Sequence, residues 1–249
     1  MALAIMQPYL FPYVGYWQLI ANSDHFVFFD VVKYNKKSWM NRNRILHPSK
    51  MGEFLYISVP IKKHPPGTII KDAVIQNEEN WKKKILGQLT IYKQLKAPYY
   101  DETIALIKGI FSVHYESYMS LAVDSTAQIC SYLDIEFKYK VASQIEFDQS
   151  AVDGPGDWAL ALCLHLDQKS YINPHGGYEI FDEEKYNDHG VDIKFIKSNL
   201  SAYHQSVRND FTAGLSIIDV LMFNSKEEIR RILKQDFQKM NKDDLKRIL

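Results

Sequence analysis

Short continuous apolar runs and a stretch with helical spacing fill the first thirty or so residues of the chain. The runs at 2–6 (ALAIM) and 25–30 (HFVFFD) predict buried strands. Between them, residues 14–23 place apolar side chains at the spacing of a short helix. A strand, a helix and a second strand in this order predict a parallel βαβ unit with a right-handed crossover.

Beyond this unit, further expected strands flank a long helical section. Apolar positions recur at spacings of three and four residues from about 78 to 133, where Asp101 is an expected N-cap. The turn DGPGDW at 153–158 leads into a helix, and PHGGY at 174–178 resembles a hairpin turn. The other expected strands are 53–61, 69–75, 135–143, 170–173 and 191–197, and helices are expected at 215–224 and 226–249.

The pattern as a whole predicts an α/β protein with a parallel-sheet, Rossmann-like core and a largely helical middle section. We expect an N-terminal βαβ-type core with candidate ligand loops at 1–77, and a helical segment or subdomain at 78–133. The remaining α/β core and the C-terminal helices follow at 134–249. No flexible linker separates these parts, so one domain overall is an equal alternative.

Composition narrows the classes of function. Lys plus Arg and Asp plus Glu are both 30, so the formal charge is zero and a generally basic nucleic-acid binder is not expected. No apolar run approaches the roughly 20 residues of a membrane span, and the N-terminus lacks the pattern of a secretory signal. We therefore expect a cytoplasmic protein in which Cys130 and Cys163 are buried thiols and not a disulfide.

Prolines, a glycine and aromatic residues crowd the segment directly after the first expected strand. In open parallel sheets, ligands bind at the turns that lead from strands into helices. Pro8 and Pro12 would stiffen such a loop, and Gly15 would permit close backbone approach near the helix start. We expect a ligand-binding loop here, and a turn packed by its own aromatics is the alternative. The candidate substrate-binding residues of this loop are Gln7, Tyr9, Tyr13 and Tyr16.

A second candidate binding segment is NKKSWMNRNRI at 35–45, within the polar, basic stretch 33–50. Arginine offers a planar fork for phosphate or carboxylate, asparagine binds amide and hydroxyl edges, and tryptophan stacks on a flat ring. This set fits a nucleotide-linked or otherwise phosphorylated ligand, and a solvated basic loop is the alternative. Asp30, at the end of the second strand, could bind a sugar hydroxyl or cap the next turn. The candidates in the stretch are Lys37, Trp39, Asn41, Arg42, Asn43 and Arg44.

Candidate catalytic groups come from the second half of the chain. His165 and His204 are the candidates for a general base, although a structural helix histidine is the favoured interpretation of His165. Tyr203 and Gln205 are further candidates for substrate binding. Asp219 interrupts an apolar helical run, where a carboxylate needs hydrogen bonds, so we expect it to have a structural role.

Several familiar signatures are missing from the sequence. It contains no GxGxxG, P-loop, GxSxG or HExxH motif. The motifs that dinucleotide-binding proteins, kinases, hydrolases and metalloproteases of the familiar classes require are therefore missing. No two histidines lie three or four residues apart and there is no CxxC, so no metal site is expected. The cofactor is therefore open, with ATP and an activated acyl donor as the candidates.

These motifs together resemble the WbqC-like family of bacterial proteins. IMQPYLFPYVGYWQLI, then FVFFD, SWMNRNRIL, YHQ and LSIIDVL match its pattern in order, over almost the whole chain. The sequence departs from it at FFDVV, which lacks a second acidic residue after Asp30, and at YINPHGGY, where smaller residues are usual. The resemblance implies a cytoplasmic protein of surface-polysaccharide (O-antigen) biosynthesis. It also suggests attachment of an aminoacyl or similar acyl group to an amino sugar.

A weaker resemblance links the loop to nucleotidyltransferases of the HxGH type, pantothenate synthetase among them. The segment Tyr13–Val14–Gly15–Tyr16 occupies the frame of that motif, with tyrosine at both histidine positions. The likeness implies a nucleotidyltransferase-like core and activation of a carboxylate by ATP before an amide forms. Loss of both histidines removes the cationic donors that stabilise a transferring phosphate, which puts that mechanism in doubt.

The leading expectation is acyl- or aminoacyl-transfer to a nucleotide-linked amino sugar. One alternative is a non-catalytic protein that binds a sugar nucleotide or carrier, or that serves in assembly. Another is an ATP-dependent enzyme of adenylyl transfer and amide formation. The expected partner is a nucleotide-linked sugar or another phosphorylated small molecule, and a homodimer is an open option.

Overall fold

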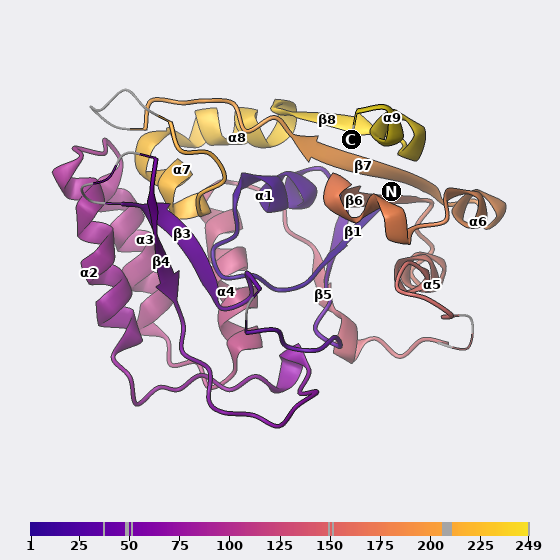
Figure 1. Cartoon of the computed structure of the whole chain (residues 1–249), viewed down its shortest axis with the longest axis horizontal. Coiled ribbons are helices and arrows are strands. Elements are labelled where there is room, and N and C mark those ends of the chain that lie inside the picture. Colours follow the sequence, from indigo (N-terminus) through magenta and orange to yellow (C-terminus); the bar gives the residue numbers. More distant parts are fainter. Residues whose placement is uncertain are drawn as a thin grey trace.

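The central feature of the computed structural model is a six-stranded sheet (Figure 1). The structure describes residues 1–36, 38–47, 50, 52–148, 150, 152–205 and 211–248. The strand order of the sheet is β5-β2-β1-β6-β7-β8, and all neighbours pair in parallel except β7 and β8. The parallel strands thus follow the order 3-2-1-4-5 along the chain, as in doubly wound sheets, which confirms the expected α/β class. The strands are β1 (Ala2–Met6), β2 (His25–Phe28), β5 (Tyr139–Val141), β6 (Ser170–Pro174), β7 (Asp192–Ser198) and β8 (Phe237–Met240).

Alternate residues of the central strands pack into two different cores. In β1, Ala4 packs into one cluster, whereas Leu3 and Ile5 pack into the other. Because side chains of a strand alternate between faces, the continuous apolar runs of the sequence reflect a sheet that is covered on both sides. On one side α1 (Val14–Ala21) packs against β6, β7 and α8 (Lys226–Gln235). On the other lie α5 (Asp157–His165), α6 (Glu183–Asp188) and α9 (Lys242–Ile248).

The expected helical middle section is present and lies beside the sheet (Figure 1). It contains α2 (Trp81–Gln94), α3 (Tyr100–Ser112) and α4 (Tyr118–Tyr132), which pack in sequence order. The two-stranded hairpin of β3 (Arg42–Leu46) and β4 (Phe54–Ser58) contacts α2, and α7 (Ile217–Phe223) packs between α3 and β3. The division of the chain into three parts stays a prediction.

Some expected elements differ in the structure. Strand β3 falls inside the basic stretch 33–50, where no strand was expected, because its buried positions Asn43 and Ile45 alternate with arginines and hide the pattern. The stretch 69–75 holds a short 3₁₀ helix, η1 (Ile70–Asp72), in place of a strand. Asp101 is not an N-cap, because α3 begins one residue earlier and Asp101 lies in its first turn.

Two predictions about turns and helices near the C-terminus were also wrong. PHGGY is not a hairpin turn, since the chain continues from β6 into the 3₁₀ helix η3 (His175–Ile180). The tail is not helical throughout, because β8 separates α8 from α9. Strand β8 pairs with β7 and covers what would otherwise be an open sheet edge, a tertiary advantage that outweighs local helical periodicity.

Two predictions from composition can be compared directly with the structure. Cys130 and Cys163 are free and buried, as expected, and burial raises the pKa of both thiols to about 12. Among the described residues, none of the helices has the length and apolar character needed to traverse a lipid bilayer.

Asp219 joins α7 to the segment at 203–205. The side chain is fully buried and accepts hydrogen bonds from the Tyr203 hydroxyl and from Gln205 Nε2, the latter at 2.6 Å. Burial raises the pKa of Asp219 to about 6, against the opposing effect of hydrogen bonds from Tyr203, Gln205 and Tyr92. These contacts agree with the structural role expected for this carboxylate.

We predict that Asp219→Asn removes a pH-dependent part of the free energy of unfolding. The pKa of Asp219 is higher in the folded state, so its contribution is complete below pH 4 and is lost as pH rises through 6. Relative to the variant, the wild type should therefore lose about 2 kcal/mol between pH 4 and pH 6.5. Urea denaturation across this range measures the difference, and parallel curves for the two proteins would contradict the prediction.

Candidate ligand-binding site

The loop at 7–13, between β1 and α1, is fixed by side chains from two distant segments. Asn43 Nδ2, from β3, donates to the carbonyl oxygens of Leu10 at 3.0 Å and Phe11 at 2.9 Å. Ser216 Oγ, at the start of α7, donates to the Phe11 carbonyl at 2.7 Å. Phe11 has φ of 42°, a left-handed conformation that a bulky residue rarely adopts unless its surroundings enforce it. We call these bonds from Asn43 and Ser216 the loop clamp.

Backbone bonds extend the loop clamp. Ser216 N donates to the Arg44 carbonyl at 2.8 Å, and Ile217 N donates to the Pro12 carbonyl at 2.9 Å. On the other side of the loop, the buried Tyr118 hydroxyl donates to the Pro8 carbonyl at 3.1 Å. The loop is therefore held to β3, α4 and α7 by the protein's own contacts.

The tyrosines of the loop divide into a buried and a half-buried group. Tyr16 is 2% exposed and its hydroxyl donates to the Gln7 carbonyl at 3.1 Å, so it supports the loop from the hydrophobic core. Tyr9 is half-buried and donates to Gln7 Oε1 at 3.3 Å. Tyr13 is half-buried and packs over Gly15, where an added Cβ would lie 2.6 Å from its ring. The close approach expected at Gly15 is thus made by the protein's own tyrosine.

The loop and the basic stretch line one concavity, which we call the arginine pocket. Its volume is about 210 Å³. Five candidate residues, from both predicted segments, lie in its wall, although their role in binding stays a prediction. The lining residues are Tyr9, Pro12, Tyr13, Trp39, Asn43, Arg44, Leu200 and Gly214.

Arg44 is the cation of this pocket. Its guanidinium lies 5.0 Å from the Trp39 ring and 4.8 Å from the Phe54 ring, and Nη2 donates to the Gly214 carbonyl at 2.9 Å. Its Nε is buried without a hydrogen-bond partner among the described residues. A buried N–H of a cation favours an acceptor, so an anionic oxygen is the group that would complete Arg44. Gly214 has φ of +67°, and a Cβ there would lie 3.2 Å from Nη2, so glycine leaves room for this arrangement.

A larger cavity, of about 780 Å³, lies beyond the carboxyl ends of β1, β2 and β6. From β1 the chain continues to β2 on one side, whereas β6 lies on the other side of β1, so this is the topological switch point where open α/β sheets bind ligands. We call it the switch-point cavity. Its lining includes Ile5, Met6, Gln7, Tyr9, Phe29, Val32, Asp153, Gly154, Pro155, Trp158, Tyr171, Asn173, Gly176, Ile180 and Phe181.

Tyr9 lines both the arginine pocket and the switch-point cavity. Burial, with a smaller effect of Tyr13, raises the pKa of Tyr9 above its ordinary value. Its hydroxyl therefore stays protonated at neutral pH and can act as a hydrogen-bond donor between the two spaces. Two ligand groups, one in each space, would meet at this side chain.

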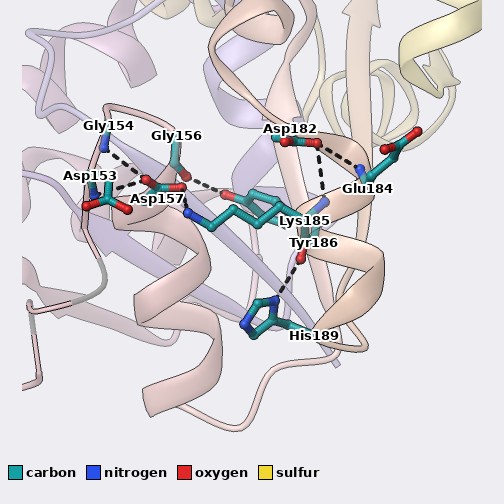
Figure 2. A network of polar contacts seen from close by, with 9 residues as sticks. All are labelled: Asp153, Gly154, Gly156, Asp157, Asp182, Glu184, Lys185, Tyr186 and His189. Carbon is teal, nitrogen blue, oxygen red and sulfur yellow. Dashed lines mark hydrogen bonds and ion pairs between the residues drawn. The ribbon is translucent and has the colours of Figure 1, made fainter.

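Asp153 and Gly154 line the switch-point cavity, and Figure 2 shows the polar contacts that join their turn to residues of α6. Asp157, the first residue of α5, accepts from Gly154 N at 2.9 Å and pairs with Lys185 Nζ at 2.8 Å. The pairing with Lys185 is the main cause that lowers the pKa of Asp157. Tyr186 donates its hydroxyl to the Gly156 carbonyl at 2.7 Å. The turn at 153–156 is thus held open as part of a preformed wall.

Three other candidates lie outside both cavities. Asp30 is 1% exposed and its two carboxylate oxygens accept from the backbone N–H and the hydroxyl of Ser143, so it caps the turn after β5. Asn41 Nδ2 donates to the Val59 carbonyl at 2.7 Å. Arg42 Nε donates to the Ser38 carbonyl, and its guanidinium lies 4.9 Å from the Tyr56 ring. Lys37 lies outside the described residues.

The candidates from the second half of the chain do not line either cavity. Tyr203 and Gln205 hold Asp219, and Gln205 also exchanges two hydrogen bonds with the backbone of Thr212. His165 and His204 are exposed, and His165 packs its ring 6.0 Å from that of Phe147. The catalytic roles of both histidines stay predictions that no neighbouring group supports in the part of the chain that the structure describes.

Most of the switch-point cavity escaped the sequence analysis. Trp158 and Asn173 are far from the loop in sequence and reach the cavity only through the strand order. The available signals were the DGPGDW turn, which leads into α5, and the PHGGY segment, which follows β6. Turn chemistry after a predicted strand could have suggested them as ligand loops.

We predict that Asn43→Ala destabilises the protein by about 2 kcal/mol, because the buried Leu10 carbonyl loses its donor from the loop clamp. Asn41→Ala is the matched control, since it removes an amide next to β3 that, among the described residues, donates to the Val59 carbonyl and not to the loop. Urea denaturation of both variants measures the difference. Equal free energies of unfolding for the two variants would show that the loop does not depend on Asn43.

Comparison with known proteins places the chain in a family. The model of the WbqC-like protein family matches residues 7–231. The chain is also 25% identical over 224 residues to the uncharacterized protein Rv1507c of Mycobacterium tuberculosis (strain ATCC 25618 / H37Rv), a match that covers 89% of this chain and 92% of that protein. No solved structure matches it significantly. Since the match includes the loop, β3 and α7, the chain belongs to the WbqC-like protein family.

Proposed function

We propose that this protein binds a nucleotide-linked amino sugar and transfers an acyl or aminoacyl group to its amine. The observation that carries the proposal is the arginine pocket, where the guanidinium of Arg44 lies beside Trp39 and the loop tyrosines and its buried Nε has no hydrogen-bond partner among the described residues. The family resemblance adds the context of bacterial surface-polysaccharide biosynthesis.

Each component of a nucleotide-linked sugar finds matching chemistry in this pocket. Arg44 supplies a charge and a planar fork for a phosphate oxygen. Trp39 is 40% exposed, which leaves ring surface for a base or a sugar to stack on. Tyr9 and Tyr13 add hydroxyls whose raised pKa keeps them as hydrogen-bond donors at neutral pH.

The adjoining cavity supports a transfer reaction over simple binding. In the proposed step the sugar amine attacks the acyl carbonyl carbon, the C–N bond forms, and the bond to the leaving group breaks. Tyr9 lies between the two spaces, and its hydroxyl would exchange its 3.3 Å bond to Gln7 Oε1 for one to the carbonyl oxygen as negative charge develops there. Holding both reactants at one side chain lowers the entropy cost of their encounter.

The amine proton requires a base. Of the described residues that line the two cavities, Asp153 carries the one carboxylate, and it joins His165 and His204 as a candidate. The exposed positions of the two histidines, outside both cavities, favour the non-catalytic binding protein as the second candidate function. Adenylyl transfer has less support, because the described lining of the switch-point cavity offers no lysine, arginine or histidine for a triphosphate.

We predict that Arg44→Met weakens binding of uridine diphosphate N-acetylglucosamine at least ten-fold, because a charge-assisted bond to phosphate is lost. Isothermal titration calorimetry measures the dissociation constant. Arg231→Met is the control, since it removes one positive charge from an exposed position of α8. Equal affinities for both variants and the wild type would contradict the proposed binding site.

Mass spectrometry distinguishes transfer from binding alone. The protein is incubated with a uridine-diphosphate-linked amino sugar and either acyl-coenzyme A thioesters or free amino acids with ATP. We expect the mass of the nucleotide sugar to increase by that of one acyl or aminoacyl group, joined through an amide bond. Intact binding without this product across the panel would favour the non-catalytic function, and release of pyrophosphate with product would favour adenylyl transfer.

A further inference from the structure

The switch-point cavity differs in chemistry from the arginine pocket. Aromatic and aliphatic side chains dominate its wall, and its volume of about 780 Å³ lies within the usual range of small-molecule sites. Among its described lining residues there is no lysine, arginine or histidine, and the one formally charged side chain is Asp153. A phosphate here would meet a carboxylate and no cation, whereas Arg44 serves that purpose on the other side of Tyr9.

Three polar side chains of this cavity, Tyr9, Tyr171 and Asn173, already make hydrogen bonds within its wall. The Tyr171 hydroxyl donates to Asn173 Oδ1 at 2.8 Å, and Asn173 Nδ2 donates to the Pro174 carbonyl at 2.9 Å. Tyr9 similarly donates to Gln7 Oε1. Because these bonds engage the hydroxyls of Tyr9 and Tyr171 and the amide of Asn173 within the wall, an occupant needs to supply few hydrogen bonds and can be apolar.

The apolar surfaces of the cavity are held in place by ring contacts. Trp158 meets Phe29 edge to face with ring centroids 5.5 Å apart, and Tyr171 lies 5.6 Å from Phe181. The neighbouring turn is braced by the Asp157–Lys185 ion pair (Figure 2). When an apolar group displaces water from a cavity with rigid apolar walls, the free energy of binding is favourable.

We propose that the switch-point cavity binds an uncharged, apolar side group, aromatic or branched aliphatic, and that it selects the acyl group by this means. The assignment rests on the proposed function: the phosphorylated acceptor occupies the arginine pocket, and the acyl carbonyl lies near Tyr9 with its side group in the larger cavity. The nucleotide is thereby excluded from the switch point of this sheet.

The four tryptophans allow the two spaces to be observed separately. Trp158 lines the switch-point cavity and Trp39 lines the arginine pocket, whereas Trp17 and Trp81 are buried in the core. In protein labelled with 5-fluorotryptophan, each gives a ¹⁹F resonance that can be assigned by single Trp→Phe replacements. The apolar probes are N-acetyl-L-phenylalaninamide and N-acetyl-L-leucinamide, with N-acetylglycinamide as the probe that lacks a side group.

We expect the phenylalanine and leucine probes to shift the Trp158 resonance saturably and to bind roughly ten-fold or more tightly than the glycine probe. The Trp39 resonance should not follow this titration. Gly176→Phe should weaken binding of both apolar probes at least ten-fold, because Gly176 lines the cavity and a Cβ there meets open space. Gly87→Phe, on α2, is the control. Unchanged Trp17 and Trp81 resonances show that each variant is folded.

The inference is overturned if the apolar probes leave Trp158 unaffected, or if the glycine probe binds equally well. A titration with uridine diphosphate N-acetylglucosamine tests the proposed function separately, through Trp39. If this ligand shifts Trp158 and not Trp39, both assignments are wrong. If Trp39 stays silent while the apolar probes shift Trp158, the apolar cavity is upheld and the proposed acceptor site is not.

Discussion

The bonds from Asn43 to the Leu10 and Phe11 carbonyls are the interaction on which the candidate site depends. Both residues of the loop are almost fully buried, so their carbonyls need donors from the protein. The same asparagine side chain accepts from Arg44 N at 2.8 Å, which fixes the strand that carries the arginine. One amide thus sets the position of the loop relative to Arg44, and the arginine pocket exists because these two segments cannot separate.

Charge distinguishes the two spaces of the candidate site. The arginine pocket has a cation with an unused N–H, and the switch-point cavity has apolar walls with satisfied polar groups. Tyr9 belongs to both. A ligand pair with one phosphorylated and one apolar member fits this division. With two phosphorylated ligands, the second phosphate would lie near the carboxylate of Asp153 and be repelled by it. The rigid loop favours binding by preorganisation, since little ordering is required when a ligand arrives.

The sequence was sufficient to predict the features that depend on local pattern. The βαβ unit at the N-terminus and the helical section near 78–133 follow from apolar spacing, and both are present. Tyr9, Trp39 and Arg44 were singled out because they follow predicted strands, and the structure brings them to one pocket. Their separation in sequence is modest, and the parallel pairing of β1 with β2 determines that both segments emerge at the same edge.

Features that depend on long-range contacts could not be predicted in this way. Asn43 has a side chain typical of ligand-binding residues, yet its amide donates to the carbonyls of Leu10 and Phe11, 33 and 32 residues earlier in the chain. Asp30 resembled a sugar ligand, but it caps a turn 113 residues further along the chain. The switch-point cavity requires β6 to lie beside β1, an order that no local spacing contains. Strand β8 likewise owes its conformation to the open edge of β7.

The most direct test of this account is a crystal structure of the protein grown with uridine diphosphate N-acetylglucosamine. We expect Asn43 Nδ2 within hydrogen-bond distance of the Leu10 and Phe11 carbonyls, and a phosphate oxygen bound to Arg44 Nε. A nucleotide bound in the switch-point cavity, or a loop at 7–13 that is detached from Asn43, would contradict the account.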